Sequence, residues 1–282
     1  MLLTPKNIEA WLHRRRWARR LIREVRQADG IVVSHTKSGK TWMRVMISHV
    51  YHLQYGVPAD ELIKLDNLHR LNPAIPTLFF SRDTKIPTFK LGGGEVPLPY
   101  DRKMLFVIRD PRDVAVSFYF HVKNRAGYHE LDRKGITEAD GSLELYDFVV
   151  NEKLGVPRVI DHMNRWYEEM QGMPQRLVVK YEEMKTEPAE VLDRVMTFLD
   201  RGFERHVIDG SVEFASFDSL SRKEADGFFK SNKLKPSNPE DGDSYKVRRG
   251  KIGGYRDYFN DEQIARIDRL VSDRLNPEYG YR

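Results

Sequence analysis

One segment, residues 31–42, constrains the fold of this chain more than any other, and it reads IVVSHTKSGKTW. An apolar run rich in β-branched residues ends in a short turn of small and basic residues, and an amphipathic helix pattern begins at Thr41. A strand that leads through a tight turn into a helix leaves backbone N–H groups that point one way, where the helix dipole also favours an anion. Lys37 and Lys40 add positive charge there. The segment therefore predicts a phosphate-binding loop.

The spelling of this loop distinguishes two classes of nucleotide-binding protein. A nucleotide-hydrolysing P-loop reads G-x-x-x-x-G-K-S/T, and the corresponding eight residues here, Ser34 to Thr41, lack the first glycine. The segment TKSGKTW is instead similar to TYPKSGTTW, the 5′-phosphosulfate loop of sulfotransferases that use 3′-phosphoadenosine 5′-phosphosulfate (PAPS).

Three further segments resemble signatures of the same family, in the same order along the chain. Residues 104–120 read MLFVIRDPRDVAVSFYF and resemble a strand followed by R-(N/D)-P-(K/R)-D-x-x-x-S. Residues 178–185 read VVKYEEMK and resemble a strand that ends in Y-E-D-M, and residues 248–259 resemble the late R-K-G-x-x-G loop. The resemblance implies a PAPS-dependent sulfotransferase of the cytosolic type with a P-loop fold.

The resemblance gives the phosphate-binding loop a role in chemistry. Backbone amides of Ser38, Gly39 and Lys40, together with the Thr41 hydroxyl, would bind the 5′-phosphate, and glycine permits a close backbone approach. Lys37 would reach the oxygen that bridges phosphorus and sulfur, where negative charge grows as the sulfuryl group leaves. This chemistry requires no metal ion, because the lysine and the loop amides neutralise that charge.

Arg109 follows the apolar run 105–108, at the strand end where open α/β sheets place ligand groups, and its planar fork suits a terminal phosphate. Asp110-Pro111 predicts a helix start, because proline is favoured at the first helical position. The resemblance implies that Arg109 and Ser117 contact the 3′-phosphate. Alternatively, Arg109 pairs with Asp113 in a surface network of little energetic value.

Aromatic residues are the expected adenine contacts. In the family, the tryptophan that closes the phosphate loop and a later phenylalanine sandwich the base, which implies this role for Trp42 and Phe217. Ala215 replaces a threonine of the family pattern, so one hydroxyl contact is lost. Tyr181 is a further expected adenine contact. The alternative is that all three aromatic side chains belong to the core.

Arg248, Arg249 and Gly250 begin the late glycine-rich loop, for which the resemblance implies phosphate binding. The alternative is a solvated run of charge at the protein surface.

The general base departs from the family pattern. Family members carry a histidine after the second strand, and residues 79–83 here read FFSRD, with Arg82 at that position. Arginine stays protonated at ordinary pH, so Arg82 is expected to steady the transferring sulfuryl oxygens rather than to accept a proton. Asp83 is the first candidate for the base. The other candidates are His35, His69, Glu95 and His121.

Length and composition favour one α/β domain over residues 1–282, because no linker or composition break divides the 282 residues. The chain has no cysteine, which excludes disulfides and cysteine catalysis, and its net charge of +5 fits a protein that binds a phosphorylated anion without implying nucleic acid. The absence of a long apolar run or signal-peptide core leads us to expect a cytoplasmic protein.

The order of elements predicts a central parallel sheet flanked by helices. Strands are expected near 31–33, 77–81, 104–109 and 176–180, with helical stretches between them, as in other alternating α/β folds. The helices that we expect with clear bounds are 7–26, within a basic N-terminal segment 1–28, then 41–55 and 261–275. The basic helix is expected to dock on the domain, or alternatively to contact an anionic membrane surface.

Two polar segments are expected to act as lids. Residues 124–142 are expected to lie over the acceptor pocket, and residues 224–247 form a long loop before Arg248 that is expected to be mobile without ligand.

The sequence therefore predicts a sulfotransferase that moves a sulfuryl group from PAPS to a hydroxyl or amine of an unidentified small-molecule, glycan or lipid acceptor. The other product would be adenosine 3′,5′-bisphosphate (PAP). Two alternatives remain, a non-catalytic protein that binds PAP or PAPS, and a P-loop kinase or nucleoside triphosphatase. The oligomeric state stays open.

Overall fold

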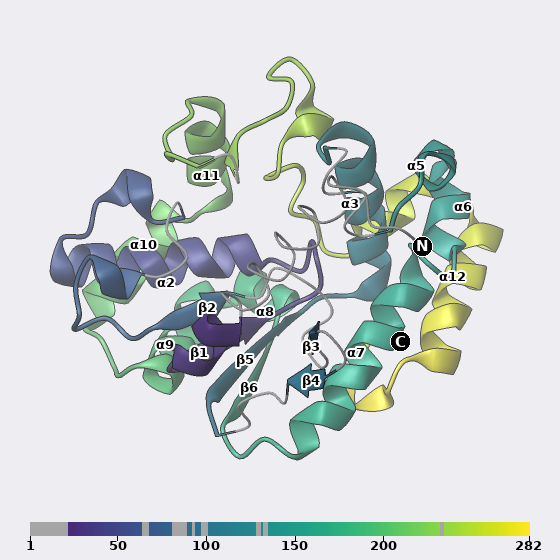
Figure 1. The fold of residues 1–282 in the computed structure, drawn as a ribbon. Coiled ribbons are helices and arrows are strands. Elements are labelled where there is room, and N and C mark those ends of the chain that lie inside the picture. Colours follow the sequence, from purple (N-terminus) through teal and green to yellow (C-terminus); the bar gives the residue numbers. More distant parts are fainter. Residues whose placement is uncertain are drawn as a thin grey trace, which may run out of the picture.

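The computed structural model describes residues 22–63, 68–80, 89–91, 94–96, 101–127, 131, 135–231 and 234–282. A four-stranded parallel sheet lies at the centre of the fold (Figure 1), with the strand order β2-β1-β5-β6. The strands are β1 (Gly30–Val33), β2 (Leu78–Phe80), β5 (Lys103–Ile108) and β6 (Arg176–Lys180). The predicted α/β class with a central parallel sheet is confirmed, and the predicted strand positions agree with the observed ones within two residues at each end.

Side chains on alternate strand positions enter two separate hydrophobic clusters, one on each face of the sheet, because successive side chains of a strand point to opposite faces. Val32 and Leu105 join the cluster on one face, and Ile31, Met104 and Phe106 join the cluster on the other. The first face is covered by α2 (Lys40–Tyr55), α9 (Pro188–Leu199) and α10 (Arg205–Phe214); the second is covered by α3 (Pro111–Asn124), α7 (Val156–Gln171) and α12 (Asp261–Arg274).

The remaining elements are short. Two three-residue strands form an antiparallel hairpin that the sequence pattern did not predict, β3 (Phe89–Leu91) and β4 (Gly94–Val96). The short helices are α5 (Glu138–Ser142), α6 (Leu145–Val150), α8 (Tyr181–Thr186), α11 (Phe217–Ala225), η1 (Ala59–Glu61), η2 (Leu68–Arg70), η4 (Gly242–Ser244), η5 (Gly254–Tyr258) and η6 (Pro277–Tyr279).

Local capping explains where α3 and α12 begin. The Asp110 carboxylate accepts a hydrogen bond from the Arg112 backbone N–H at 2.9 Å and Pro111 is the first residue of α3, as predicted. Asn260 and Gln263 form a capping box at the start of α12. These caps fix the start of α3 directly after β5, so the first turn of the helix stands at the edge of the sheet.

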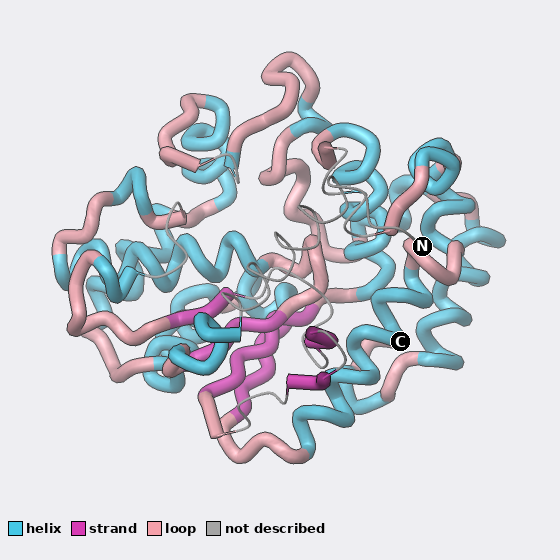
Figure 2. The backbone as a smooth tube through the Cα atoms, viewed as in Figure 1, coloured by secondary structure: helices cyan, strands magenta, loops and turns pink. Residues whose placement is uncertain are grey.

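Long loops arch over one end of the sheet (Figure 2). The predicted lid 224–247 begins in the last residues of α11 and continues as irregular chain with η4, and Phe229 and Leu234 bury their side chains in the cluster around α2. Within the predicted lid 124–142, the described residues include the end of α3 and α5. Movement of either segment stays a prediction. Of the predicted N-terminal helix, the structure describes residues 22–26, which are helical.

No helix among the described residues is long and apolar enough to cross a membrane.

Candidate functional site

A cavity of about 700 Å³ opens at the carboxyl edge of the parallel sheet, the edge where open α/β sheets bind ligands. Residues that follow β1, β5 and β6 meet there with the loop that begins at Arg248. The predicted cofactor residues that line the cavity are Lys37, Gly39, Lys40, Thr41, Trp42, Arg109, Ser117, Tyr181, Phe217, Arg248, Arg249 and Gly250. Ser38, by contrast, is buried and does not belong to the cavity lining.

The phosphate-binding loop has the backbone conformation that a tight turn requires. Gly39, the N-cap of α2, has a φ of +97°. Lys37 has a φ of +77°, in the left-handed region that residues other than glycine rarely adopt. A Cβ atom at Gly39 would lie 2.8 Å from the ring of Tyr181. Glycine is therefore required at position 39 for two reasons, and the first turn of α2 presents its N–H groups toward the cavity edge.

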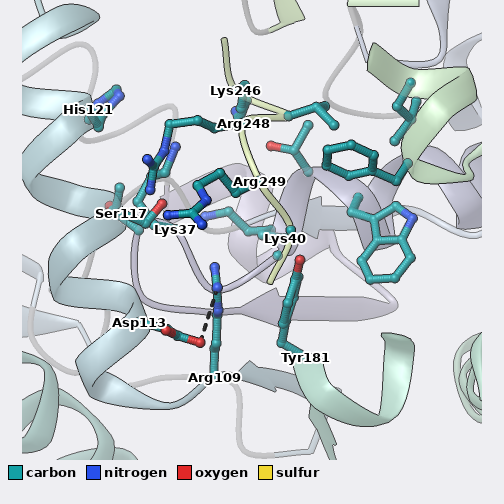
Figure 3. A pocket seen from close by; sticks show the side chains of 18 of the residues that line it. Lys37, Lys40, Arg109, Asp113, Ser117, His121, Tyr181, Lys246, Arg248 and Arg249 are labelled. Atoms are coloured by element: carbon teal, nitrogen blue, oxygen red, sulfur yellow. Dashed lines mark hydrogen bonds and ion pairs between the residues drawn. The ribbon is translucent and has the colours of Figure 1, made fainter. Parts of the chain in front are cut away.

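Lys37 lies within a group of positive charges (Figure 3). Its side chain is gathered with those of Arg248 and Arg249 between Ser117 on α3 and Tyr181. Burial lowers the pKa of the Lys37 ammonium well below its ordinary value, and the charges of Lys246, Arg125, Arg109 and Arg248 lower this pKa further. A bound anion would raise this pKa again, because its negative charge favours the charged form of the lysine.

Arg109 is fixed at the end of β5 by contacts on three sides. One terminal nitrogen of its guanidinium lies 3.4 Å from the Asp113 carboxylate and donates to the Lys251 carbonyl at 3.1 Å, and its carbon lies 4.3 Å from the centre of the Tyr181 ring. The expected alternative pairing with Asp113 therefore occurs, but the pair is buried, with 11% and 2% of the two side chains exposed. The Arg109 Nε atom is buried without a hydrogen-bond partner among the described residues.

Asp113 joins the first turn of α3 to the late glycine-rich loop. Its carboxylate accepts hydrogen bonds from the backbone N–H groups of Gly253 at 2.9 Å and Tyr255 at 3.0 Å. Burial raises the pKa of Asp113, and the nearby charge of Arg109 opposes that increase. Through Asp113 and Arg109, the loop that carries Arg248 and Arg249 is held against the end of β5.

The late loop presents its cations from a fixed backbone. Gly250 has a φ of +59°, and a Cβ atom there would lie 2.9 Å from the Phe217 ring. The Arg248 guanidinium lies 4.0 Å from the centre of the Phe120 ring and pairs with Asp243 at 3.1 Å. The expected alternative of a solvated charge run does not describe Arg248, because only 14% of its side chain is exposed.

The aromatic residues expected to contact adenine lie on one wall of the cavity. The Trp42 indole N–H donates to the Ala215 carbonyl at 2.8 Å, and its ring meets the Tyr181 ring edge-on at 5.6 Å. The Lys185 ammonium lies 6.0 Å from the Trp42 ring and 5.6 Å from the Phe217 ring. This wall therefore offers both aromatic faces and a cation to a flat, electron-rich group.

The structure describes only some of the candidates for the general base. Arg82 and Asp83 lie outside the described residues, as does the Glu95 side chain, and His69 bonds the Ile75 carbonyl without lining the cavity. His35 and His121 both line it. The His35 Nδ1 atom lies 2.9 Å from the Thr36 carbonyl, to which it can only donate, so the lone pair of the neutral ring resides on Nε2.

A buried ion pair that the sequence pattern did not predict lies beside the cavity, which its arginine, Arg125, lines. The Glu224 carboxylate, which has no exposed surface, pairs with Arg125 at 3.1 Å and accepts from the backbone N–H groups of Lys246 at 2.8 Å and Val247 at 2.9 Å. Arg125 also donates to the carbonyls of Ser244 and Lys235. The pair therefore fixes the chain just before Arg248 onto α3 and α11. Other unpredicted cations that line the cavity are Arg44, Lys185, Lys246 and Lys251.

The fold and site define a class of α/β protein in which a loop between a strand and a helix, supported by arginines from neighbouring segments, forms a phosphate-binding cavity. The chain belongs to the family described as the sulfotransferase domain, whose model matches residues 96–277. It is therefore a sulfotransferase enzyme.

The chain is also similar to curated proteins and to solved structures, several of which are named as sulfotransferases. The chain is 27% identical to cytosolic sulfotransferase 16 of Arabidopsis thaliana, over 89% of this chain and 77% of the relative. It is 23% identical to the amine sulfotransferase of Oryctolagus cuniculus, over 89% and 82%. The structure of mouse sulfotransferase SULT7A1 complexed with PAP covers 90% of this chain and 89% of its own, with a TM-score of 0.55 at 18% identity. Retinol dehydratase in a complex with retinol and PAP gives a TM-score of 0.60 at 17% identity, over 88% and 81%. At these identities the two structures support the fold.

Proposed function

We propose that this sulfotransferase takes its sulfuryl group from PAPS and transfers it to a hydroxyl or amine of a small-molecule, glycan or lipid acceptor. One observation carries the proposal: the phosphate-binding loop, Arg109 and the late glycine-rich loop all line one cavity. Two structural neighbours named above were solved with PAP. The cavity residues fit such a ligand, because Gly39 and Gly250 keep the backbone close to aromatic rings and Arg109 has a buried Nε without a partner among the described residues.

The division of roles rests on the resemblance of each segment to the family motifs. Amides at the start of α2, together with Lys40 and the Thr41 hydroxyl, bind the 5′-phosphate. Arg109 and Ser117 bind the 3′-phosphate. Arg248 and Arg249, in the late loop, also contact this phosphate. Trp42, Tyr181 and Phe217 contact the adenine. The Ser38 side chain is buried, and its backbone N–H, which donates to the His35 carbonyl at 3.3 Å, joins the amides that bind the 5′-phosphate.

PAPS supplies an activated sulfuryl group that leaves from a phosphate oxygen. In the transfer, the bond from sulfur to the bridging oxygen breaks, the bond from sulfur to the acceptor oxygen or nitrogen forms, and PAP leaves with the bridging electron pair. Lys37 stabilises the charge that develops on the bridging oxygen. Arg82 stabilises the sulfuryl oxygens, and Asp83 takes the proton from the hydroxyl or amine of the acceptor. Both roles are assigned from the sequence pattern.

The wider setting is proposed on similar grounds. One domain spans residues 1–282, and the basic composition of segment 1–28 suits contact with an anionic membrane surface. Relatives named as cytosolic sulfotransferases support a cytoplasmic location. No nucleic acid partner is proposed.

The alternative of a P-loop kinase loses its support at Asp110. A kinase would need this residue to hold magnesium. Its carboxylate instead caps α3 and receives the Arg112 guanidinium at 2.7 Å. Family membership points the same way.

Calorimetric titration with PAP, and with ATP in the presence and absence of magnesium, tests the proposal. We expect tight binding of PAP that does not depend on magnesium. Preference for ATP with magnesium would refute it.

Two substitutions then separate catalysis from binding. Lys37→Ala should lower the rate of transfer far more than the affinity for PAP, and Arg109→Ala should do the reverse. Equal losses of both quantities in the two variants would contradict the assigned roles.

A further inference from the structure

Asp257 neutralises two cations of the late loop from outside the cavity. Its carboxylate lies 2.5 Å from the Arg249 guanidinium and 2.6 Å from the Lys251 ammonium. Arg249 and Lys251 line the cavity, whereas Asp257, in η5, does not. The Arg249 and Lys251 side chains are 41% and 51% exposed, so both can reorient toward a ligand.

The Tyr258 hydroxyl explains why the loop needs this carboxylate. It accepts hydrogen bonds from both Arg248 at 2.6 Å and Arg249 at 3.0 Å, which brings two guanidinium groups to one oxygen atom. Like charges at such separations repel, and a nearby carboxylate compensates them. The hydrogen bond from Lys251 holds the pKa of Asp257 below its usual value, so the carboxylate is charged at neutral pH.

The same two cations lie beside the proposed 3′-phosphate position. Arg109 is the residue assigned to that phosphate, and its guanidinium donates to the Lys251 carbonyl at 3.1 Å. The backbone of residue 251 therefore lies in contact with the arginine that is proposed to bind the phosphate. A phosphate in contact with Arg249 and Lys251 would therefore share them with the Asp257 carboxylate.

We propose that Asp257 is an internal counter-anion that competes with the 3′-phosphate of the nucleotide for Arg249 and Lys251. The competition weakens the binding of PAPS and PAP alike, because both carry the 3′-phosphate, and for PAP it favours release after transfer. Asp257 also balances the positive charge of Arg249 and Lys251 when no nucleotide is bound. The inference rests on the proposed binding of a 3′,5′-bisphosphate at this site.

The test compares two nucleotides on three proteins by calorimetry. The proteins are the unsubstituted chain, Asp257→Asn, and Glu262→Gln as a control that removes one exposed negative charge from the first turn of α12. The ligands are PAP and adenosine 5′-monophosphate, which lacks the 3′-phosphate. Asp257→Asn retains an oxygen that can accept from Arg249, and Tyr258 still holds that arginine, so we expect the variant to fold.

We expect Asp257→Asn to bind PAP roughly three- to tenfold more tightly, as expected when one opposing charge is removed at about 5 Å in a partly solvated site. Binding of adenosine 5′-monophosphate should change less than about twofold, and the gain for PAP should shrink in high salt. Glu262→Gln should change neither ligand appreciably.

Three results would overturn the inference: unchanged PAP affinity, weaker PAP affinity, or equal tightening of both nucleotides. Weaker affinity would mean that Asp257 aligns the cations for the phosphate. Failure of the proposed function gives a different pattern, because the unsubstituted protein would then not bind PAP at all.

Discussion

Glu224→Gln should destabilise the protein and weaken nucleotide binding together. The carboxylate has no exposed surface and receives three donors, one from Arg125 and one each from the backbone of Lys246 and Val247. A glutamine side chain has one acceptor oxygen, so its NH₂ group would face at least one of these donors. Arg125, with 9% of its side chain exposed, would also lose its counter-charge.

The magnitude follows from burial. Removing one partner of a buried pair costs about 3–5 kcal/mol, because the other charge is left uncompensated. For a protein of this size, such a loss lowers the melting temperature by on the order of 10 °C. The affected segment leads directly into Arg248, so PAP affinity should fall as well.

The assay is chemical unfolding of four proteins, namely the unsubstituted chain, Glu224→Gln, Arg125→Met and the double variant. The double variant should lose less than the sum of the two single losses, by about 1–3 kcal/mol, because no buried charge remains unpaired. Glu183→Gln is the matched control. It breaks a pair with Arg194 whose side chains are 40% and 49% exposed, and it should cost less than about 1 kcal/mol. A Glu224→Gln loss no larger than that of the control, or strict additivity in the double variant, would refute the reasoning.

Three further predictions concern the cavity. Gly39→Ala should lower PAP affinity at least about tenfold, because the positive φ and a Cβ atom 2.8 Å from Tyr181 force the loop to move; Gly202→Ala, which meets nothing within 4 Å, should leave calorimetric affinity unchanged. Binding of PAP should take up protons at pH values between the lowered pKa of free Lys37 and its higher value in the complex, so affinity should fall as pH rises through that window. Calorimetry in buffers of different ionisation enthalpy measures this uptake, and Lys37→Met should abolish it. Protease should cut within 224–247 more slowly when PAP is present, and equal rates would refute the predicted lid.

The fold and most of the candidate site could be predicted from the sequence because their signals are local. Alternating strand and helix patterns give a parallel sheet, and parallel strands end at one edge, so motifs that follow β1, β5 and β6 meet in space. Lys37, Arg109 and Tyr181 therefore line one cavity although they are far apart in the sequence. Ser38 does not line the cavity, because a tight turn directs some side chains into the protein as others face the ligand; its predicted contact is through the backbone N–H and stays a prediction.

The Arg125–Glu224 ion pair and the contacts of Asp113 with the late loop could not be predicted in the same way, because they join groups across long stretches of sequence. Arg125 and Glu224 are separated by 99 residues, and the carboxylate of Asp113 contacts an amide 140 residues away. Neither belongs to a periodic pattern. The β3–β4 hairpin was missed for a related reason, since strands of three residues are too short for an alternating pattern to stand out.

All but one of the acidic residues described above as partners of cavity cations share one arrangement. Asp113 lines the cavity, whereas Glu224, Asp243 and Asp257 pair with lining arginines or lysines without lining it themselves. A cavity that binds a highly charged anion must bring cations close together, and their mutual repulsion opposes folding before the ligand arrives. Carboxylates placed behind the cations reduce that repulsion while the face toward the cavity stays positive. The exposed pair at Asp257 can yield to a ligand, whereas the fully buried Glu224 cannot be reached by one. The first therefore adjusts affinity, and the second holds the loop in place.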